Sequence, residues 1–174
     1  RGTLRRPWAH KECASLLFVG RLVEEKGPHI LLEALAGLLA DRKWQMTIVG
    51  DGPLRQELES YVSQTGLSAR VTFTGWLPQG KVLEQMKASD VIIIPSLFEG
   101  LSSVAIEALS LCIPVIASNV GGLTEILSDG CGMLVEPSSA HALRLAVHEV
   151  LTNPHLLAIM TDAIATAGCT RFAW

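Results

Sequence analysis

One stretch of the sequence predicts most of the fold: VIIIPSLFEGLSSVAIEA, residues 91–108. Its apolar start, Val91–Ile94, is typical of a buried strand, because it is short and rich in β-branched residues. The stretch from Ser103 onward is typical of a helix, and Gly and Ser residues fill the turn before it. Glu99 stands in the turn and Glu107 follows eight positions later, about 2.2 helical turns if a helix covers the span. We therefore expect both carboxylates to face one cleft, beside N–H groups of a helix N-terminus.

Strand and helix signals alternate in the same way along the rest of the chain, which predicts a parallel sheet covered on both faces. The expected fold class is α/β, a Rossmann-like three-layer α/β/α sandwich with about six parallel strands. The expected strands are Leu16–Val19, Met46–Val49, Val71–Thr74, Val91–Ile94, Val115–Ala117 and Met133–Val135. The expected helices are Pro28–Ala40, Pro53–Gln64, Gly80–Ala88, Ser103–Leu111, Leu123–Leu127, Ala140–Leu151 and Pro154–Ala167.

Composition favours one folded domain. The chain has 174 residues, of which 49% are hydrophobic and 18% charged, enough apolar residues for a real core. A formal net charge of −3 gives no basic field for nucleic acid. The sequence contains no apolar run of membrane-spanning length and no signal-peptide pattern.

Four cysteines, Cys13, Cys112, Cys131 and Cys169, form no C-x-x-C pair and have no His at a zinc-like spacing. They favour reduced, mostly buried thiols and a cytoplasmic protein. The chain opens with Arg1 rather than Met, so we expect a piece of a longer protein. We expect a linker or hinge at residues 1–14, the domain at 15–170, and the start of a truncated return segment at 171–174.

Ligands of open parallel sheets bind at the carboxyl ends of the strands, and every expected loop at that edge carries Gly or Pro. Arg21 and Lys26, five residues apart after the first strand, either clamp a diphosphate or are two solvated cations. The sequence Gly50-Asp51-Gly52 after the second strand is an incomplete dinucleotide fingerprint, so a tight turn is favoured.

The two glutamates also allow alternatives. Glu99 and Glu107 form a general acid and base pair, or contact the hydroxyls of a ligand, or are ordinary helix acids. We favour hydroxyl contacts, because an anion fits between them and a nucleotide-sugar has that shape. Gly121-Gly122, with Glu125 nearby, forms another loop on the ligand edge and indicates either a close backbone approach or a plain turn.

Taken together, these residues resemble the C-terminal domain of GT-B retaining glycosyltransferases of family four, the group 1 glycosyltransferases. The resemblance covers residues 16–135 in the family's order. Its matching pieces are Phe18 to Leu22, Glu25 to Gly27, Ile48 to Leu54, Val71 to Gly75, Pro95 to Ala108, Pro114 to Ser118, and Gly121-Gly122 with Glu125.

The resemblance implies roles for individual residues. Gly20 belongs to the binding loop, and Arg21 and Lys26 would hold the donor diphosphate and stabilise the leaving group. Glu99 would contact sugar hydroxyls, Glu107 the ribose hydroxyls, and backbone near Leu77 the base. Backbone N–H groups around the helix start would meet sugar and phosphate, at Gly100, Leu101, Ser102 and Ser103. No bound metal and no other cofactor is expected, since cations and a helix N-terminus serve the phosphates, and the sequence has no Asp-x-Asp.

One departure from the family is Cys112, where Gly is usual before Ile113-Pro114. Gly eases a left-handed helix end there, so the Cys takes another conformation or accepts strain. The family's acceptor-binding N-terminal domain is also missing from this sequence. We expect that domain to be a partner, and any peripheral attachment to the cytoplasmic face of a membrane to come through it.

The sequence thus predicts the donor-binding domain of an enzyme that transfers a hexosyl group from a nucleoside-diphosphate sugar to an acceptor hydroxyl. Alone, it should bind nucleotide weakly and show little or no transfer. Two alternatives stay open, a nicotinamide-dinucleotide-binding Rossmann domain and a non-catalytic subunit of a split glycosyltransferase. The nicotinamide reading needs Asp51 as the acid for the ribose.

Overall fold

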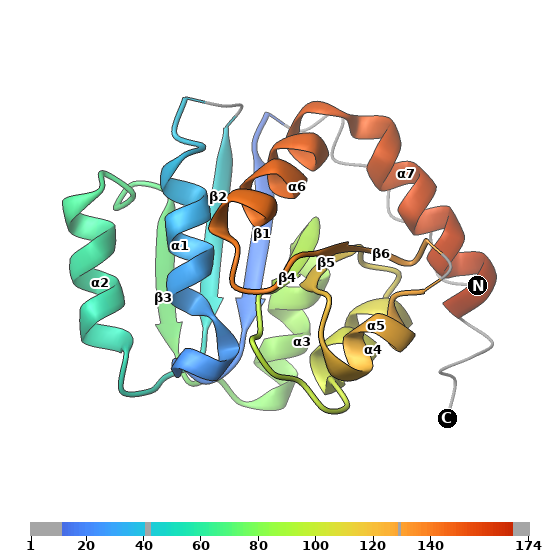
Figure 1. Ribbon diagram of the computed structural model, residues 1–174, viewed down its shortest axis with the longest axis horizontal. Coiled ribbons are helices and arrows are strands. Elements are labelled where there is room, and N and C mark those ends of the chain that lie inside the picture. The colour runs from blue at the N-terminus through green and yellow to red at the C-terminus, as the bar shows by residue number, and fades with distance from the viewer. Residues whose placement is uncertain (1–11, 41–42, 129, 169–174) are drawn as a thin grey trace.

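The fold is a six-stranded parallel sheet between two layers of helices (Figure 1). A computed structural model describes residues 12–40, 43–128 and 130–168. The strand order is β3-β2-β1-β4-β5-β6. The strands are β1 (Ala14–Val19), β2 (Trp44–Val49), β3 (Val71–Gly75), β4 (Val91–Ile94), β5 (Val115–Ser118) and β6 (Gly132–Val135). The predicted fold class is confirmed.

Helices follow the strands in the expected places. They are α1 (Pro28–Ala36), α2 (Arg55–Gln64), α3 (Gln79–Ala88), α4 (Ser103–Ser110), α5 (Gly121–Ile126), α6 (Ala140–Thr152) and α7 (Pro154–Ala163). A short 3-10 turn, η2 (Glu24–Lys26), precedes α1, and a π-helical turn, η3 (Ile164–Gly168), extends α7.

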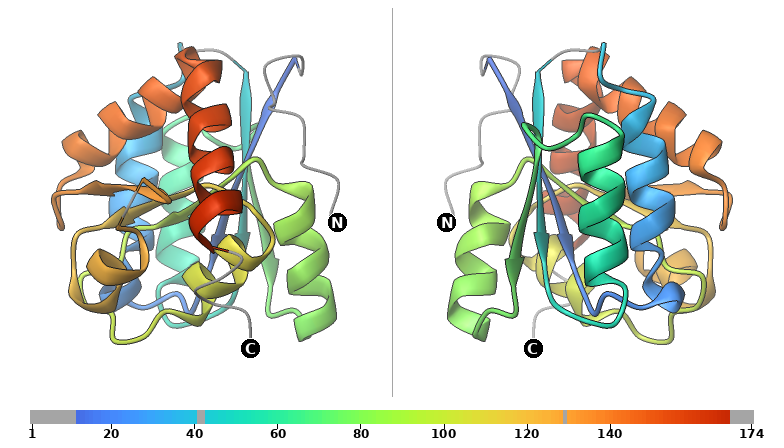
Figure 2. Two further views of the ribbon diagram at one scale, coloured as in Figure 1. Left: turned by 90° about the vertical axis from the view of Figure 1, so that its right-hand side faces the viewer. Right: turned by 90° about the vertical axis from the view of Figure 1, so that its left-hand side faces the viewer.

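The core has two halves, one on each face of the sheet. One half packs α1, α2 and α6 against side chains such as Leu16 and Phe18 of β1. The other packs α3, α4 and α5 against Leu17 of β1 and Ile92 of β4. Successive strand residues point to opposite faces, so a strand buried on both sides must be apolar throughout, which is why the strands were readable from the sequence. The edge-on views show α3 on the opposite side of the sheet from α1 and α2 (Figure 2).

Several helix boundaries differ from the prediction. The helix expected to reach residue 40 ends at Ala36, because the Gly37 and Leu38 amides already donate to carbonyls three residues back. The helix expected from residue 53 begins at Arg55, since the Leu54 amide donates instead to the Leu22 carbonyl oxygen at 3.0 Å.

The ends of the chain and the cysteines bear on further expectations. Residues 1–11 of the expected linker and the segment 171–174 lie outside the described residues, as does Cys169. The first strand already begins at Ala14. Of the described cysteines, Cys131 is buried, whereas Cys13 and Cys112 are half-buried, so the expectation of mostly buried thiols was wrong for those two.

The strand order creates one special position, between β1 and β4. The chain moves outward from β1 to β2 and β3, and then returns to place β4 on the other side of β1. At such a switch point the loops that follow the two central strands diverge and leave a crevice at the carboxyl ends. Those ends lie along the bottom of the molecule as Figure 1 shows it.

Candidate functional site

The loop after β1 carries both predicted cations. Arg21 is exposed and Lys26 is half-buried at the end of η2. Gly27, with φ of 67°, ends that turn and starts α1. A Cβ at Gly27 would overlap the Pro95 carbonyl oxygen, so the loops after β1 and β4 touch backbone to backbone. The Leu97 amide also donates to the Glu25 carbonyl oxygen at 2.8 Å.

An ion pair joins these two loops at the crevice. The Lys26 ammonium lies 2.9 and 3.1 Å from the two carboxylate oxygens of Glu99. The Ser96 hydroxyl donates to the same carboxylate at 2.9 Å. The Glu99 side chain is only 11% exposed and that of Lys26 33%. Charged groups with so little water around them need such partners, and both side chains are thereby held in one orientation.

The N-terminus of α5 packs against the loop after β4 that carries Glu99, called here the Glu99 loop. The Gly122 amide donates to the carbonyl oxygens of Glu99, at 3.3 Å, and Gly100, at 3.1 Å. A Cβ on Gly121 would overlap the Glu99 carbonyl oxygen, and one on Gly122 the Gly100 carbonyl oxygen. The close approach predicted from this glycine pair is therefore an approach of the chain's own backbone. Glu125 is exposed on the same short helix.

The N-terminus of α4 opens into the crevice. Ser102 is buried and caps the helix, with its hydroxyl oxygen accepting a bond from the Ala105 amide at 3.2 Å. The first N–H groups of a helix have no acceptor within the helix, and here they belong to Ser103 and Val104. Both residues line the crevice. These N–H groups and the helix dipole together favour an anion at this point.

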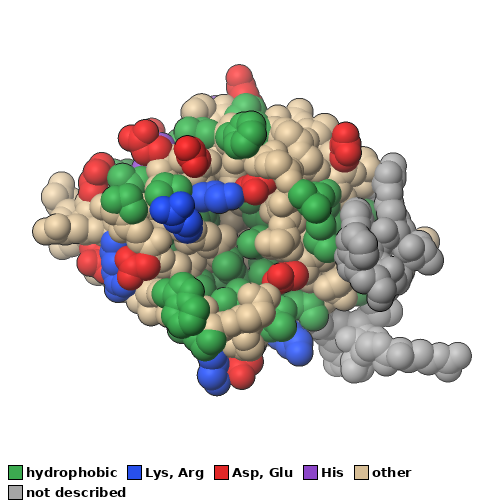
Figure 3. Space-filling view, turned by 90° about the horizontal axis from the view of Figure 1, so that it is seen from below, with side chains coloured by type: hydrophobic (Ala, Val, Ile, Leu, Met, Phe, Trp, Pro, Cys, Tyr) green, Lys and Arg blue, Asp and Glu red, His purple; other side chains and the backbone are tan. Residues whose placement is uncertain are grey.

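The crevice consists of two adjoining hollows that share Val19, Gly20, Ser103 and Val104. The larger, of about 260 Å³, has an apolar lining that includes Leu77, Val82 and Met86, with Glu107 and Arg21 at its wall. The smaller, of about 100 Å³, is lined by Lys26, Ser96 and Glu99 among others. Seen from below, the molecule shows a hollow with hydrophobic side chains inside and basic and acidic side chains along its rim (Figure 3).

The second glutamate lies in the larger hollow. Glu107 is half-buried and its two carboxylate oxygens accept from the side-chain amide of Gln79, each at 3.1 Å. The helix begins only at Ser103, so Glu107 is just over one turn into α4 and Glu99 precedes the helix. The two carboxylates therefore line two adjoining hollows of the crevice, Glu99 the smaller and Glu107 the larger, and do not share one hollow.

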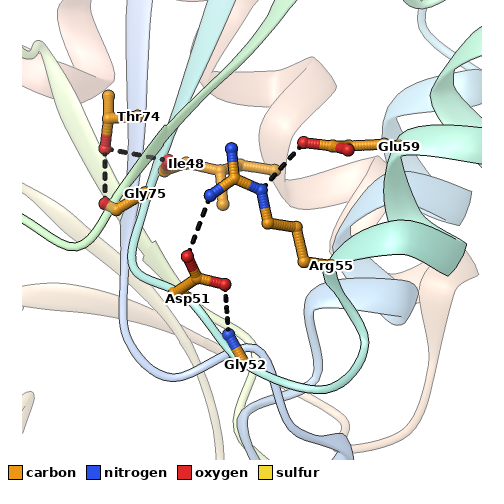
Figure 4. A network of polar contacts seen from close by, with 7 residues as sticks. All are labelled: Ile48, Asp51, Gly52, Arg55, Glu59, Thr74 and Gly75. Carbon is orange, nitrogen blue, oxygen red and sulfur yellow. Dashed lines mark hydrogen bonds and ion pairs between the residues drawn. The ribbon is translucent and has the colours of Figure 1, made fainter.

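Asp51, at the end of β2, is tied into a network of its own (Figure 4). Its carboxylate accepts from the Gly52 amide at 2.8 Å and from Arg55 at 2.9 Å. Arg55 also donates to Glu59 at 2.9 Å. The Gly52 amide, and after it the Arg55 guanidinium, hold the pKa of Asp51 below its ordinary value. The Gly50-x-Gly52 sequence thus forms a tight turn, as the sequence predicted. The Asp51 carboxylate is hydrogen-bonded by Gly52 and Arg55 within that turn and the helix after it.

The structure brings most of the predicted residues to this crevice. Ten were named: Gly20, Arg21, Lys26, Leu77, Glu99, Gly100, Leu101, Ser102, Ser103 and Glu107. All but Gly100 line one of the two hollows. Leu101 projects at the rim, 73% exposed. Sequence reasoning missed Ser96, which lines the smaller hollow, and Trp76 and Gln79, which line the larger. Ser96 was within the quoted motif, whereas Gln79 is 28 positions from its partner Glu107 and carries no motif signal.

Within residues 12–40, 43–128 and 130–168, no group of three or more His, Cys, Asp or Glu side chains is arranged to hold a metal ion. Among the described helices, none combines the length and apolar character that crossing a membrane requires.

A parallel α/β domain with its crevice at the switch point, lined by a helix N-terminus and a Lys–Glu pair, defines a Rossmann-like domain of the GT-B kind. The chain belongs to the family described as Glycosyl transferases group 1, which matches residues 2–166.

Named relatives agree with this assignment. The chain is 30% identical over 175 residues to the alpha-D-kanosaminyltransferase of Streptomyces kanamyceticus, covering 99% of this chain and 45% of that protein. It is 38% identical over 139 residues to the 2-deoxystreptamine glucosyltransferase of the same organism, covering 79% of this chain and 36% of that protein. The chain therefore spans less than half the length of these relatives.

Solved structures show the same fold. Alr3699/HepE from Anabaena, in complex with UDP and glucose, superposes with a TM-score of 0.83 at 26% identity, over 92% of this chain and 45% of that one. The C-terminal domain of LpcC, a glycosyl transferase group 1 family protein from Francisella tularensis, superposes with a TM-score of 0.81 at 25% identity. That match covers 94% of this chain and 93% of the LpcC domain.

Proposed function

We propose that this chain is the donor-binding domain of a retaining glycosyltransferase, which transfers a hexosyl group from a nucleoside-diphosphate sugar to an acceptor hydroxyl. The observation that carries the proposal is the pair of joined hollows with the α4 N-terminus between them. An apolar hollow with one carboxylate suits a nucleoside, and a polar hollow with a Lys–Glu pair suits a sugar. The anion-binding N–H groups lie where the diphosphate would join the two.

The diphosphate is assigned to Arg21, Lys26 and the amides at the start of α4. An ammonium carries three donors, so Lys26 can keep its bond to Glu99 while donating to a phosphate oxygen. In the transfer, the bond between the sugar C1 and the diphosphate oxygen breaks, and its electron pair leaves with the diphosphate. The two cations and the helix N-terminus stabilise that negative charge. The acceptor oxygen bonds to C1, and its proton passes to the leaving diphosphate oxygen.

The sugar and the nucleoside are assigned to the two glutamates. Glu99, fixed by Lys26 and Ser96, presents a carboxylate to the hydroxyls of the sugar, near the backbone of Gly100 and Leu101. Glu107 accepts from the ribose hydroxyls, and backbone at Leu77 meets the base. Retention of the anomeric configuration rests on the family resemblance. Metal-independent binding rests on the cations and N–H groups gathered at the diphosphate position.

The test is calorimetric titration of the chain with UDP, GDP, ADP and NAD in the presence of EDTA. The proposal predicts that one nucleoside diphosphate binds selectively, and weakly, without a divalent ion. Binding of NAD alone, or of none of the four, would overturn the proposed donor site.

The chain spans less than half the length of each of the two relatives named above. We therefore assign acceptor binding to a domain outside this sequence, and we expect little or no transfer by the chain itself. Substantial turnover by this chain would contradict that expectation.

A further inference from the structure

We infer that the indole of Trp76 stacks on the flat face of the nucleoside base and covers the base in the larger hollow. The inference rests on the proposed function, because it deepens the role of that hollow. The backbone at Leu77 is assigned to the edge of the base, whereas the Trp76 ring is assigned to its face. Trp76 therefore sets how tightly the base is held.

Trp76 is a large aromatic side chain that the fold leaves open beside an apolar hollow. It is 75% exposed, although it lines the same hollow as Val82 and Met86. Trp44 shows the contrast, because it is 1% exposed and its indole N–H donates to the Leu38 carbonyl oxygen at 3.0 Å. An exposed indole gains free energy when a flat partner covers it. Its place beside the hollow makes a base bound there that partner.

The short loop that carries Trp76 is anchored at both ends. Gly75 before it has φ of 75°, and the Gly75 carbonyl oxygen accepts from the Gly50 amide at 2.9 Å. The Pro78 carbonyl oxygen after it accepts from two amides in the first turn of α3, at 3.1 and 2.9 Å. This loop joins β3 to α3 along the bottom of the molecule in Figure 1. The indole is thus presented on a fixed backbone, which lowers the entropic cost of stacking.

Stacking makes a demand on the side chain that an ordinary apolar wall does not make. Every nucleobase has a π-face, so an aromatic ring adds affinity for any of the bases. Replacing such a ring by alanine costs roughly five- to a hundredfold in affinity. A phenylalanine keeps a ring in place, whereas an alanine does not. The two replacements of Trp76 therefore separate the loss of stacking from a change in the loop.

The experiment measures dissociation constants of the full chain for UDP, GDP and ADP. For the diphosphate that binds wild type, Trp76→Ala should weaken the affinity by about five- to thirtyfold. Trp76→Phe should stay within about threefold of wild type, because its ring still stacks on the base. Equal losses in the two variants would contradict stacking.

Tryptophan fluorescence gives a signature that a merely structural role would not produce. A base stacked on an indole quenches its emission, so the emission of wild type should fall as the diphosphate saturates the site. Trp76→Phe should bind the same ligand without that fall, because the responding indole is gone. Trp44 is buried in the core and should contribute no change.

The matched control is Phe98→Ala. Phe98 is an aromatic residue in the loop after β4, and it is as exposed as Trp76, at 75%. It is not among the residues that line either hollow. This variant should keep the wild-type affinity and the wild-type fall in emission.

The outcomes separate the inference from the proposed function. If a diphosphate binds wild type but Trp76→Ala keeps its affinity, or if binding leaves the emission of wild type unchanged, the inference is wrong and the donor site stands. If none of the three diphosphates binds wild type, the donor site itself is refuted, and this inference with it. Circular dichroism and the melting temperature of each variant establish that the fold is intact.

Discussion

At the scale of single residues, the site depends on charges that are already paired before any ligand arrives. Lys26 and Glu99 neutralise each other in the smaller hollow, and Gln79 satisfies Glu107 in the larger. Each pairing holds a polar side chain in one orientation before a ligand arrives, which lowers the entropic cost of binding. Arg21 stays exposed at the edge of the larger hollow.

The first prediction concerns the diphosphate. Lys26→Ala should weaken the nucleoside diphosphate that binds wild type by about 1.5–3 kcal/mol, the range for a hydrogen bond to a charged group, while the corresponding nucleoside loses almost no affinity. Calorimetric titration with both ligands checks this. Lys87→Ala, an exposed lysine at the far end of α3, is the control and should change neither affinity. Equal losses of affinity for the diphosphate and its nucleoside would show that Lys26 does not act on phosphate.

The second prediction concerns the ribose. Glu107→Ala should weaken that diphosphate and its nucleoside alike, by about 1–3 kcal/mol, because the hydroxyl contacts belong to the nucleoside part. The same titrations measure it. Glu57→Ala, an exposed glutamate of α2, provides the comparison and should bind as wild type. An unchanged affinity in a folded Glu107→Ala protein would remove Glu107 from the site.

At the scale of elements, the short helix α5 acts as a support for the Glu99 loop. Gly122→Ala should cost about 1–3 kcal/mol of unfolding free energy, since its Cβ would overlap the Gly100 carbonyl oxygen. Gly80→Ala tests the same substitution at the same helix position of α3, where nothing lies within 4 Å of the added atom. That variant should be neutral or stabilised by up to about 1 kcal/mol.

Urea denaturation of the two variants gives the comparison, and titration with the nucleoside diphosphate that binds wild type adds a functional readout. A Gly122→Ala protein as stable as wild type would mean that the Glu99 loop does not depend on this close approach.

The end of α4 carries the departure noted in the sequence. Cys112 adopts φ of 55°, so it accepts the left-handed conformation that favours glycine. Cys112→Gly should therefore stabilise the fold by about 0.5–1 kcal/mol, the relief of strain exceeding the entropy that glycine adds to the unfolded chain. Ser110→Gly, in the last turn of α4, should destabilise by about 1 kcal/mol. Thermal unfolding of both measures the signs, and a destabilised Cys112→Gly would contradict the account.

At the scale of the whole molecule, the strands were predictable because burial on both faces requires apolar residues. The crevice was predictable because the alternating order of strands and helices places the loops at one edge of a parallel sheet. Val91–Ile94 is buried on both faces, so it had to be apolar throughout. The loops at the carboxyl ends gather Gly, Pro and charge at one edge of the sheet, which points to a site there.

Other features depended on three-dimensional packing and could not be read from the sequence. The Gln79 contact with Glu107 requires the relative placement of α3 and α4, which no local pattern encodes. Gly121 and Gly122 signalled a close approach, but only the structure shows that the partner is the Glu99 loop. The end of α1 at Ala36 follows from bonds that tighten its last turn.

The donor site in this crevice is tested by locating the bound nucleotide on this chain. We would titrate ¹⁵N-labelled protein with UDP, GDP and ADP and follow the backbone amide resonances. For the ligand that binds, we expect the largest shifts at Gly20, Ser103 and Val104, where the two hollows meet. Shifts confined to the separate groove of His29, Glu33 and Tyr61 between α1 and α2, or absent altogether, would contradict it.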